Sequence, residues 1–184
     1  MPERYTLTDA ARFNIARGQR APVETASGVE DLRWGLLAPW RGHGGKRGPM
    51  IHDAPVDAIA TTPLLRNARA KRRCLVLADG WYAWRGKQPY WIHAPHRAAF
   101  AGLVATHADD RIASFAIVTV PAAGVVAALG EPTMPALADA RWLADDLLAP
   151  ELAGWRADRV SNHVDDPAHD DPACVALLPQ TELF

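Results

Sequence analysis

The sequence is poor in cysteine and has no long apolar run. Cys74 and Cys174 are its only cysteines, and each lies in an apolar stretch, so we expect two buried free thiols and no disulfide framework. No run approaches the ~18 apolar residues of a membrane span, and the first twelve residues lack the apolar core of a secretory signal. We therefore predict a soluble, cytoplasmic protein without membrane contact.

Net charge is also lacking, because 20 Lys and Arg residues stand against 21 Asp and Glu residues, for a formal net charge of −1. Any anionic partner must therefore be bound by a local basic patch. The most basic stretch is residues 66–73, and residues 41–48 form a second one that is rich in glycine. Contact with nucleic acid and simple solvation are both compatible with these stretches.

Signatures of cofactor and metal sites are missing as well. We find no Gly-rich phosphate loop, no Ser-His-Asp set and no zinc-ligand spacing, so we predict no cofactor and no metal. The segment near the C-terminus that is rich in His and Asp is interpreted as a polar segment and not as a metal site. Its members are His163, His169, Asp165, Asp166, Asp170 and Asp171.

Strand-forming residues are present in abundance, above all in residues 72–103. Four short strands are predicted there, at 74–78, 81–84, 89–92 and 99–103, with turns at 79–80 and 85–87. Further strands are predicted at 4–7, 19–23, 32–37 and 114–120, and helices at 10–13, 62–71, 121–129 and 138–148. The predicted fold class is α+β: one domain over residues 1–184, with a mainly antiparallel, barrel-like sheet and peripheral helices.

Eight short motifs follow one another along the chain. They are RFNIA at 12–16, LRWGLLAPW at 32–40, RRCLVLADGWYAW at 72–84, QPY at 88–90, AFAGL at 99–103, SFAIVT at 114–119, MP at 134–135, and a closing VS at 160–161 with DDP at 170–172 and Cys174. This series resembles the SOS-response-associated peptidase (SRAP) family of abasic-site processing proteins over nearly the full length. The resemblance implies an SRAP-like fold and a role in the DNA damage response, with single-stranded, abasic DNA as the partner.

The chemistry of that family is the capture of an aldehyde. The amine and thiol of an N-terminal cysteine condense with the ring-opened abasic sugar to form a thiazolidine crosslink, and a Glu, a His and an Asn assist. Such a condensation needs proton transfers, which a carboxylate and an imidazole can carry.

The positions that the resemblance marks for this chemistry hold other residues. Pro2 stands at the position of the cysteine, Ala83 at that of the Glu, Glu131 at that of the His, and His52 at that of the Asn. We therefore expect a degenerate member, a pseudoenzyme that cannot form the thiazolidine crosslink. An inert interaction module that binds an unknown protein partner in place of DNA is the alternative.

A further alternative keeps part of the chemistry at Pro2. Removal of Met1 leaves a secondary amine, which can form an iminium with an aldehyde. Because no thiol is present, the product is a hydrolysable Schiff base that captures the abasic site reversibly. Glu3 or His52 would then carry the protons.

Five residues in the surviving motifs are candidates for a DNA-binding face: Arg4, Pro39, Trp40, Trp84 and Thr119. The resemblance implies that Pro39 acts as a wedge and Trp84 as a stacking surface beside the lesion. Base–aromatic stacking contributes about 1–3 kcal/mol per base, whereas core packing is the alternative for both tryptophans. The family has arginines where this chain has Ala54 and Thr133, which predicts weak, salt-sensitive binding.

Overall fold

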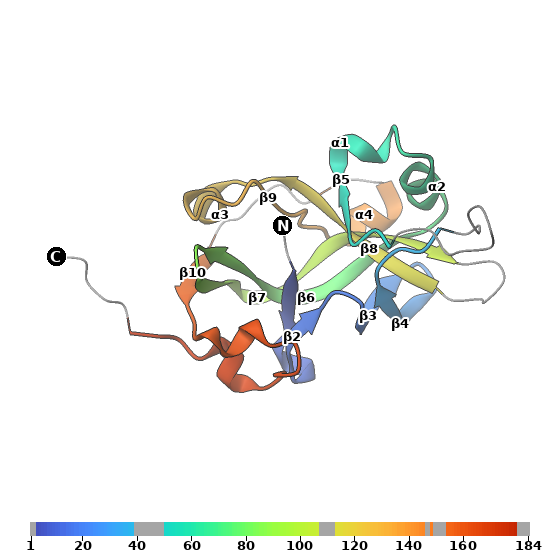
Figure 1. Cartoon of the computed structure of the whole chain (residues 1–184). Coiled ribbons are helices and arrows are strands. Elements are labelled where there is room, and N and C mark those ends of the chain that lie inside the picture. Colours follow the sequence, from blue (N-terminus) through green and yellow to red (C-terminus); the bar gives the residue numbers. More distant parts are fainter. Residues whose placement is uncertain (1–2, 39–49, 107–112, 146–147, 149–153, 180–184) are drawn as a thin grey trace, which may run out of the picture.

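A computed structural model describes residues 3–38, 50–106, 113–145, 148 and 154–179 (Figure 1). Three of the predicted site residues, Pro2, Pro39 and Trp40, lie outside these ranges, as do residues 41–48 of the glycine-rich stretch. The predictions that involve them stay predictions.

Two long strands form the centre of the fold, β6 (Arg73–Arg85) and β7 (Gln88–Thr106). They pair antiparallel over almost their whole length, so the prediction of four short strands is wrong. The turn at 85–87 is confirmed, with Gly86 at φ 62°, a backbone conformation that favours glycine. The turn predicted at 79–80 is instead a bulge, because the pairing register shifts between Ala78 and Gly80.

The bulge is held by hydrogen bonds to β1 and by close packing. The Asp79 carboxylate accepts hydrogen bonds from the Thr6 hydroxyl at 2.5 Å and from the backbone N–H of Thr8 at 2.7 Å. A Cβ atom added to Gly80 would lie 2.5 Å from Trp91 Nε1 and 2.6 Å from the Ile92 carbonyl oxygen. Only glycine fits there without displacing its neighbours, which explains how an Asp-Gly pair can lie inside a continuous strand.

Eight further strands complete the sheet: β1 (Arg4–Leu7), β2 (Arg12–Ala16), β3 (Arg20–Thr25), β4 (Gly28–Trp34), β5 (Asp53–Pro55), β8 (Ala113–Pro121), β9 (Thr133–Pro135) and β10 (Arg156–Arg159). β6, β7, β8, β4 and β3 pair in that order, and β3 pairs back to β6, so five strands close into a barrel. The pairings of β8 with β4 and β5 are parallel and the others in the described ranges are antiparallel. The prediction of a mainly antiparallel, barrel-like α+β fold is confirmed.

Short helices cover the barrel: α1 (Val56–Ile59), α2 (Pro63–Lys71), α3 (Gly124–Ala128) and α4 (Ala140–Asp145). Figure 1 shows α1 and α2 together above one side of the sheet, while the segment with the 3-10 turns η3 (Asn162–Asp165) and η4 (Pro172–Val175) lies on the opposite side, below β2. No helix in the described ranges is both long and apolar enough to cross a membrane.

The helix predicted at 10–13 is wrong. A 3-10 turn, η1 (Thr8–Ala10), ends at Ala11, which has φ 53°, and β2 follows at once. The Asp170 carboxylate accepts hydrogen bonds from the backbone N–H groups of Phe13 at 2.5 Å and Asn14 at 2.8 Å. The hydrogen bonds to Asp170, which is 156 residues further along the chain than Asn14, thus override the local preference for a helix.

Three apolar clusters stabilise the part of the chain that the structure describes. Large aromatic residues fill the barrel, and the apolar faces of α1, α2 and α4 pack on its outer side. A third cluster lies beneath η3 and η4 and contains Tyr82, Val164 and Cys174. Cys74 and Cys174 are both buried free thiols, as expected.

Candidate functional site

Strand β1 carries the first described residues to the end of the barrel interior. Tyr5 pairs with Trp81, and both side chains are buried inside the barrel. Glu3 directly precedes β1, and Ala83, two residues beyond Trp81 in β6, belongs to the same apolar cluster as Tyr5 and Trp81. The Glu3 side chain is 63% exposed, so the interior meets solvent at this end of β1.

Arg17 links Glu3 to a buried carboxylate, that of Asp53. Its guanidinium lies 4.0 Å from Glu3 Oε1 and 2.5 Å from Asp53 Oδ2, and the Asp53 side chain is only 7% exposed. Asp53 Oδ1 is buried and has no hydrogen-bond partner in the described part of the chain. Burial raises the pKa of Asp53 and the nearby Arg17 partly opposes this.

His52 precedes β5 and is held by its backbone. Its carbonyl oxygen accepts hydrogen bonds from Trp34 Nε1 and from the Ile117 N–H, both at 3.0 Å. Burial, and then the positive charges of Arg17 and Arg33, lower the pKa of His52. A lowered pKa favours the neutral imidazole, which can accept a proton.

Thr119 shares the inner face with Asp53. In the parallel pairing of β5 with β8, Asp53 is opposite Ile117 and Pro55 is opposite Thr119, so both polar side chains lie on the face of the buried Ile117. Thr119 Oγ1 is buried and, among the described residues, has no hydrogen-bond partner. We call Glu3, Arg17, His52, Asp53 and Thr119 the inner-face cluster.

The carboxylate of Glu131 lies close to β6, the strand that has an alanine at position 83. Glu131 Oε1 lies 3.5 Å from the backbone nitrogen of Trp84, directly after Ala83. Glu131, which the resemblance aligns with the family's His, thus lies close to Ala83, which the resemblance aligns with the family's Glu.

Arg4 and Trp84 point to the opposite, outer face of the sheet. The Arg4 guanidinium donates hydrogen bonds to the carbonyl oxygens of Val164 and Asp165, both at 2.5 Å, and Trp84 Nε1 donates to Asp165 Oδ1 at 2.9 Å. Arg4 is therefore engaged in holding the segment around η3, and Trp84 is half-buried at the edge of that segment. The structure thus places Glu3 and His52 near Arg17 and Thr119 on the face of Asp53, and it separates Arg4 and Trp84 from them.

Sequence reasoning missed two members of this region, Arg17 and Asp53, and it named Glu131 only as the residue at the position of the family's His. Nothing in the sequence distinguishes the Asp53 side chain, which is buried, from the exposed Asp57 four residues later. Arg17 directly follows the motif at 12–16, yet nothing in the sequence shows that it reaches β5.

Two arginines of the basic stretch at 66–73 form contacts within the protein. Arg72 forms an ion pair with Glu30, and Arg73 donates to the Leu143 carbonyl oxygen at 2.8 Å and lies over the Trp142 ring. These contacts anchor the ends of α2 and β6, so they account for part of the charge without nucleic acid.

Comparison with known proteins places these features in context. The family described as SOS response associated peptidase (SRAP) matches residues 3–166. The abasic site processing protein YoqW of Bacillus subtilis is 33% identical over 102 residues, which are 50% of this chain and 45% of that protein. The abasic site processing protein HMCES of Gallus gallus is 35% identical over 72 residues, 35% of this chain and 21% of that protein. The chain matches less than half the length of these relatives.

Two solved structures have a similar fold. A protein from Bacteroides thetaiotaomicron superposes with a TM-score of 0.73 at 21% identity and covers 90% of this chain and 85% of its own. A phage-related protein from Bordetella bronchiseptica has a TM-score of 0.61 at 26% identity, with 80% of each chain covered. The first of these supports the fold alone, because its sequence identity is low.

Proposed function

The chain belongs to the SRAP family, and from this membership we propose that it acts in the response to DNA damage by binding single-stranded DNA at abasic sites. The relatives that are named as abasic site processing proteins support this function. The expected loss of the thiazolidine crosslink is part of the proposal, because residue 2 is proline and residue 83 is alanine.

The observation that carries the proposal is the unpartnered oxygen of Asp53. A buried polar atom without a partner is costly, and such atoms are frequent where a ligand completes the hydrogen bonding. An abasic sugar has hydroxyl groups and no base, and these hydroxyls would supply the hydrogen-bond partners that the buried Asp53 Oδ1 and Thr119 Oγ1 lack. Arg17 adds a positive charge beside Asp53, and His52 lies near Arg17.

Trp84 lies on the outer face of the sheet, away from the inner-face cluster, and supports contact with bases of the bound strand that are not next to the abasic sugar. It follows Ala83 at the edge of the barrel, and its indole is oriented by the hydrogen bond to Asp165. A half-buried, oriented ring offers a stacking surface with little loss of side-chain entropy on binding. Since the formal net charge is −1, we expect the affinity to be weak and to fall as salt rises.

A fluorescence titration tests this proposal. A labelled single strand that carries a central tetrahydrofuran residue, an abasic analogue without an aldehyde, is titrated with the full chain at low salt. We expect saturable binding, and Trp84→Ala should weaken it about 5- to 150-fold, which corresponds to the loss of one stacked base. Trp84→Phe keeps the ring and should retain most of the affinity.

The thermal stability of both variants serves as the control. If Trp84 only packs in the core, Trp84→Ala lowers the melting temperature and leaves the affinity of the folded protein unchanged. Absence of binding by the wild-type protein at low salt would reject the DNA proposal and favour the inert interaction module.

A second candidate function is reversible capture of the aldehyde by the amine of Pro2. The amine nitrogen adds to the aldehyde carbon, water leaves, and an iminium results. The observation that favours it is the chain of charged groups that begins at Glu3, next to Pro2, and leads through Arg17 to Asp53. The raised pKa of Asp53 suits a group that gives and takes protons.

Borohydride trapping tests this second function. The protein with Met1 removed is incubated with a single strand that holds a true abasic aldehyde, and the iminium is reduced to a stable amine. We expect one adduct, located at Pro2 by mass spectrometry, and slower trapping by Asp53→Asn. No adduct, or an adduct on a lysine alone, rejects capture by Pro2 and leaves the binding proposal standing.

A further inference from the structure

A cluster of three different ligand types lies on the outer face of the sheet, away from the inner-face cluster. His163 belongs to η3, and Asp171 and Cys174 stand at the start and within η4. In a 3-10 turn, residues three apart in the sequence lie above one another. Asp171 and Cys174 have this spacing, and the Cys174 N–H donates to the Asp171 carbonyl oxygen at 3.0 Å.

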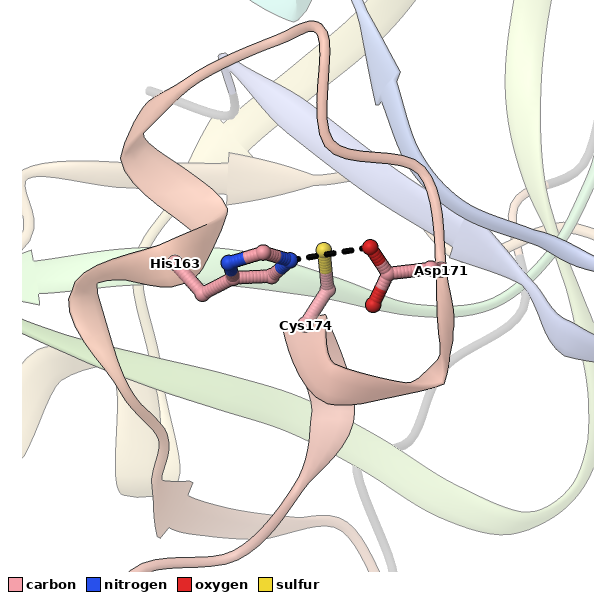
Figure 2. A group of neighbouring side chains, drawn as sticks. All are labelled: His163, Asp171 and Cys174. Carbon is pink, nitrogen blue, oxygen red and sulfur yellow. Dashed lines mark hydrogen bonds and ion pairs between the residues drawn. The ribbon is translucent and has the colours of Figure 1, made fainter.

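The side chains of these residues point toward a common centre, as Figure 2 shows. His163 Nε2 is 2.9 Å from Asp171 Oδ2, and one ligand atom from each of the three residues lies within 4.8 Å of the other two. Cys174 is fully buried, whereas the side chains of His163 and Asp171 are 31% and 49% exposed. A small ion from solvent can therefore reach the centre from the side of the His and Asp.

Neighbouring groups fix the direction of each side chain. Asp171 Oδ1 accepts a hydrogen bond from the Ala173 N–H at 2.8 Å, which leaves Oδ2 turned toward His163. The His169 ring stacks on the His163 ring at 3.9 Å with an interplanar angle of 4°, and His169 Nδ1 donates to the His163 carbonyl oxygen at 2.8 Å. Such supporting contacts are typical of the surroundings of metal ligands.

We propose that His163, Asp171 and Cys174 bind a zinc ion, with a water molecule as the fourth ligand. Zinc accepts nitrogen, oxygen and sulfur together, at about 2.0–2.3 Å from each, in tetrahedral geometry. Ligand atoms around such an ion lie about 3–4 Å apart, so the three side chains need only small rotations. Harder ions such as magnesium and calcium avoid thiolate, which argues for zinc.

Binding is a ligand exchange with a defined proton balance. The Cys174 thiol donates a weak hydrogen bond to the His169 carbonyl oxygen, 3.5 Å from its sulfur. On binding, the S–H bond breaks, a Zn–S bond forms and the proton passes to solvent. The hydrogen bond between His163 and Asp171 is replaced by two bonds to the ion, and the proton that Nε2 carries in that hydrogen bond passes to solvent while Nδ1 holds the ring proton.

This inference changes the interpretation of the His- and Asp-rich segment. The sequence predicts a polar segment without metal, because no zinc-ligand spacing is visible there. Folding adds Cys174, whose sulfur comes to lie beside His163. The same segment holds Arg4 and Trp84 through the residues of η3, so an ion here would stabilise the outer face of the sheet.

Cobalt(II) is the probe that tests the proposal, because a thiolate bound to cobalt gives a charge-transfer band in the near ultraviolet. The full chain, with its thiols reduced, is titrated with cobalt and then with zinc. We expect one equivalent of cobalt to produce the band and one equivalent of zinc to remove it. Cys174→Ser should abolish the band, and His163→Ala should weaken cobalt binding at least tenfold.

The chain offers matched controls for both ligand types. Cys74 is the other buried thiol, so Cys74→Ser should keep the band. His93 lies 2.8 Å from Asp158 and stacks on Trp91 in the same manner as His163 on His169, but without a cysteine beside it. His93→Ala should therefore leave cobalt affinity unchanged.

Two results would overturn the zinc site. One is a wild-type protein without the band, and the other is a band that survives Cys174→Ser, which would show an adventitious ion only. Circular dichroism establishes that each variant is folded. Should Cys174→Ser fail to fold, the wild-type titration together with His163→Ala and His93→Ala still decides the question.

Discussion

Asp53 is the residue on which the proposed site depends. It replaces nothing in the family's catalytic set, yet it is the most buried charged side chain of the inner-face cluster, and one of its oxygens has no hydrogen-bond partner in the described ranges. A carboxylate in such surroundings lowers stability unless something completes its hydrogen bonds. Proteins retain costly groups of this kind mainly where they serve a function.

The first residue-scale prediction concerns the pH dependence of stability in Asp53→Asn. Because the pKa of Asp53 is raised in the folded state, folding takes up protons between the unfolded and folded pKa values, and the contribution of Asp53 to stability falls as the pH rises through that window. Asp53→Asn should therefore melt at a higher temperature than the wild type at neutral pH. The difference should vanish below the unfolded pKa of about 3.9.

Thermal unfolding over a pH series measures this effect. The matched control is Asp31→Asn, since Asp31 also pairs with an arginine, Arg20, but is 59% exposed. An exposed pair contributes about 0–1 kcal/mol, so this variant should change little at any pH. If Asp53→Asn is strongly destabilised at neutral pH, the ion pair with Arg17 outweighs the burial of the carboxylate, and our account of Asp53 is wrong.

At the residue scale, the sequence alone shows that Pro2 and Ala83 stand where the resemblance expects a cysteine and a glutamate. It cannot show that Glu3, Arg17 and Asp53 meet, because they come from three segments that only the closed barrel unites. Glu131 is a similar case, since its position next to Trp84 depends on a contact between residues 47 apart.

At the scale of elements, the pair of long strands β6 and β7 organises the fold. β6 contacts β1, β3 and β7, and so connects the barrel to the start of the chain. The bulge at Gly80 bends and twists β6. This lets β6 pair with β1 as well as with β7. The sequence predicts strands at the correct places in β6 and β7. It divides β6 at the Asp-Gly pair, since that pair is also the usual signal of a hairpin turn, and it leaves residues 93–98 of β7 out of any strand.

Gly80→Ala is the element-scale prediction. The added Cβ would lie within 2.6 Å of both Trp91 Nε1 and the Ile92 carbonyl oxygen, so the two strands must separate. We expect the free energy of unfolding to fall by about 1–3 kcal/mol, the usual cost of overpacking.

Chemical denaturation measures this loss, with Gly86→Asn as the control. Gly86 has φ 62° and no atom within 4 Å of an added Cβ, and asparagine tolerates that conformation. Gly86→Asn should therefore change stability little. An unfolding free energy of Gly80→Ala equal to that of the wild type would show that the bulge is not restricted by packing.

At the scale of the whole molecule, the first and last motifs of the chain meet. The Asn14 amide donates to the carbonyl oxygens of Val164, Asp166 and His169, and the Asp170 carboxylate accepts from the backbone at residues 13 and 14. This contact gives a structural reason for the presence of both motifs, RFNIA at 12–16 and DDP at 170–172, in one chain. The inner-face cluster and the proposed zinc site lie on opposite faces of the sheet.

We propose that the inner-face cluster makes the protein selective for DNA that lacks a base. Competition at low salt tests it most directly: a labelled strand with a central tetrahydrofuran residue is bound to the full chain, and unlabelled strands with and without that residue displace it. We predict that the abasic strand displaces the label at a concentration at least tenfold lower than the undamaged strand. Equal displacement by both strands would contradict the account, since binding would then depend on the phosphate backbone alone.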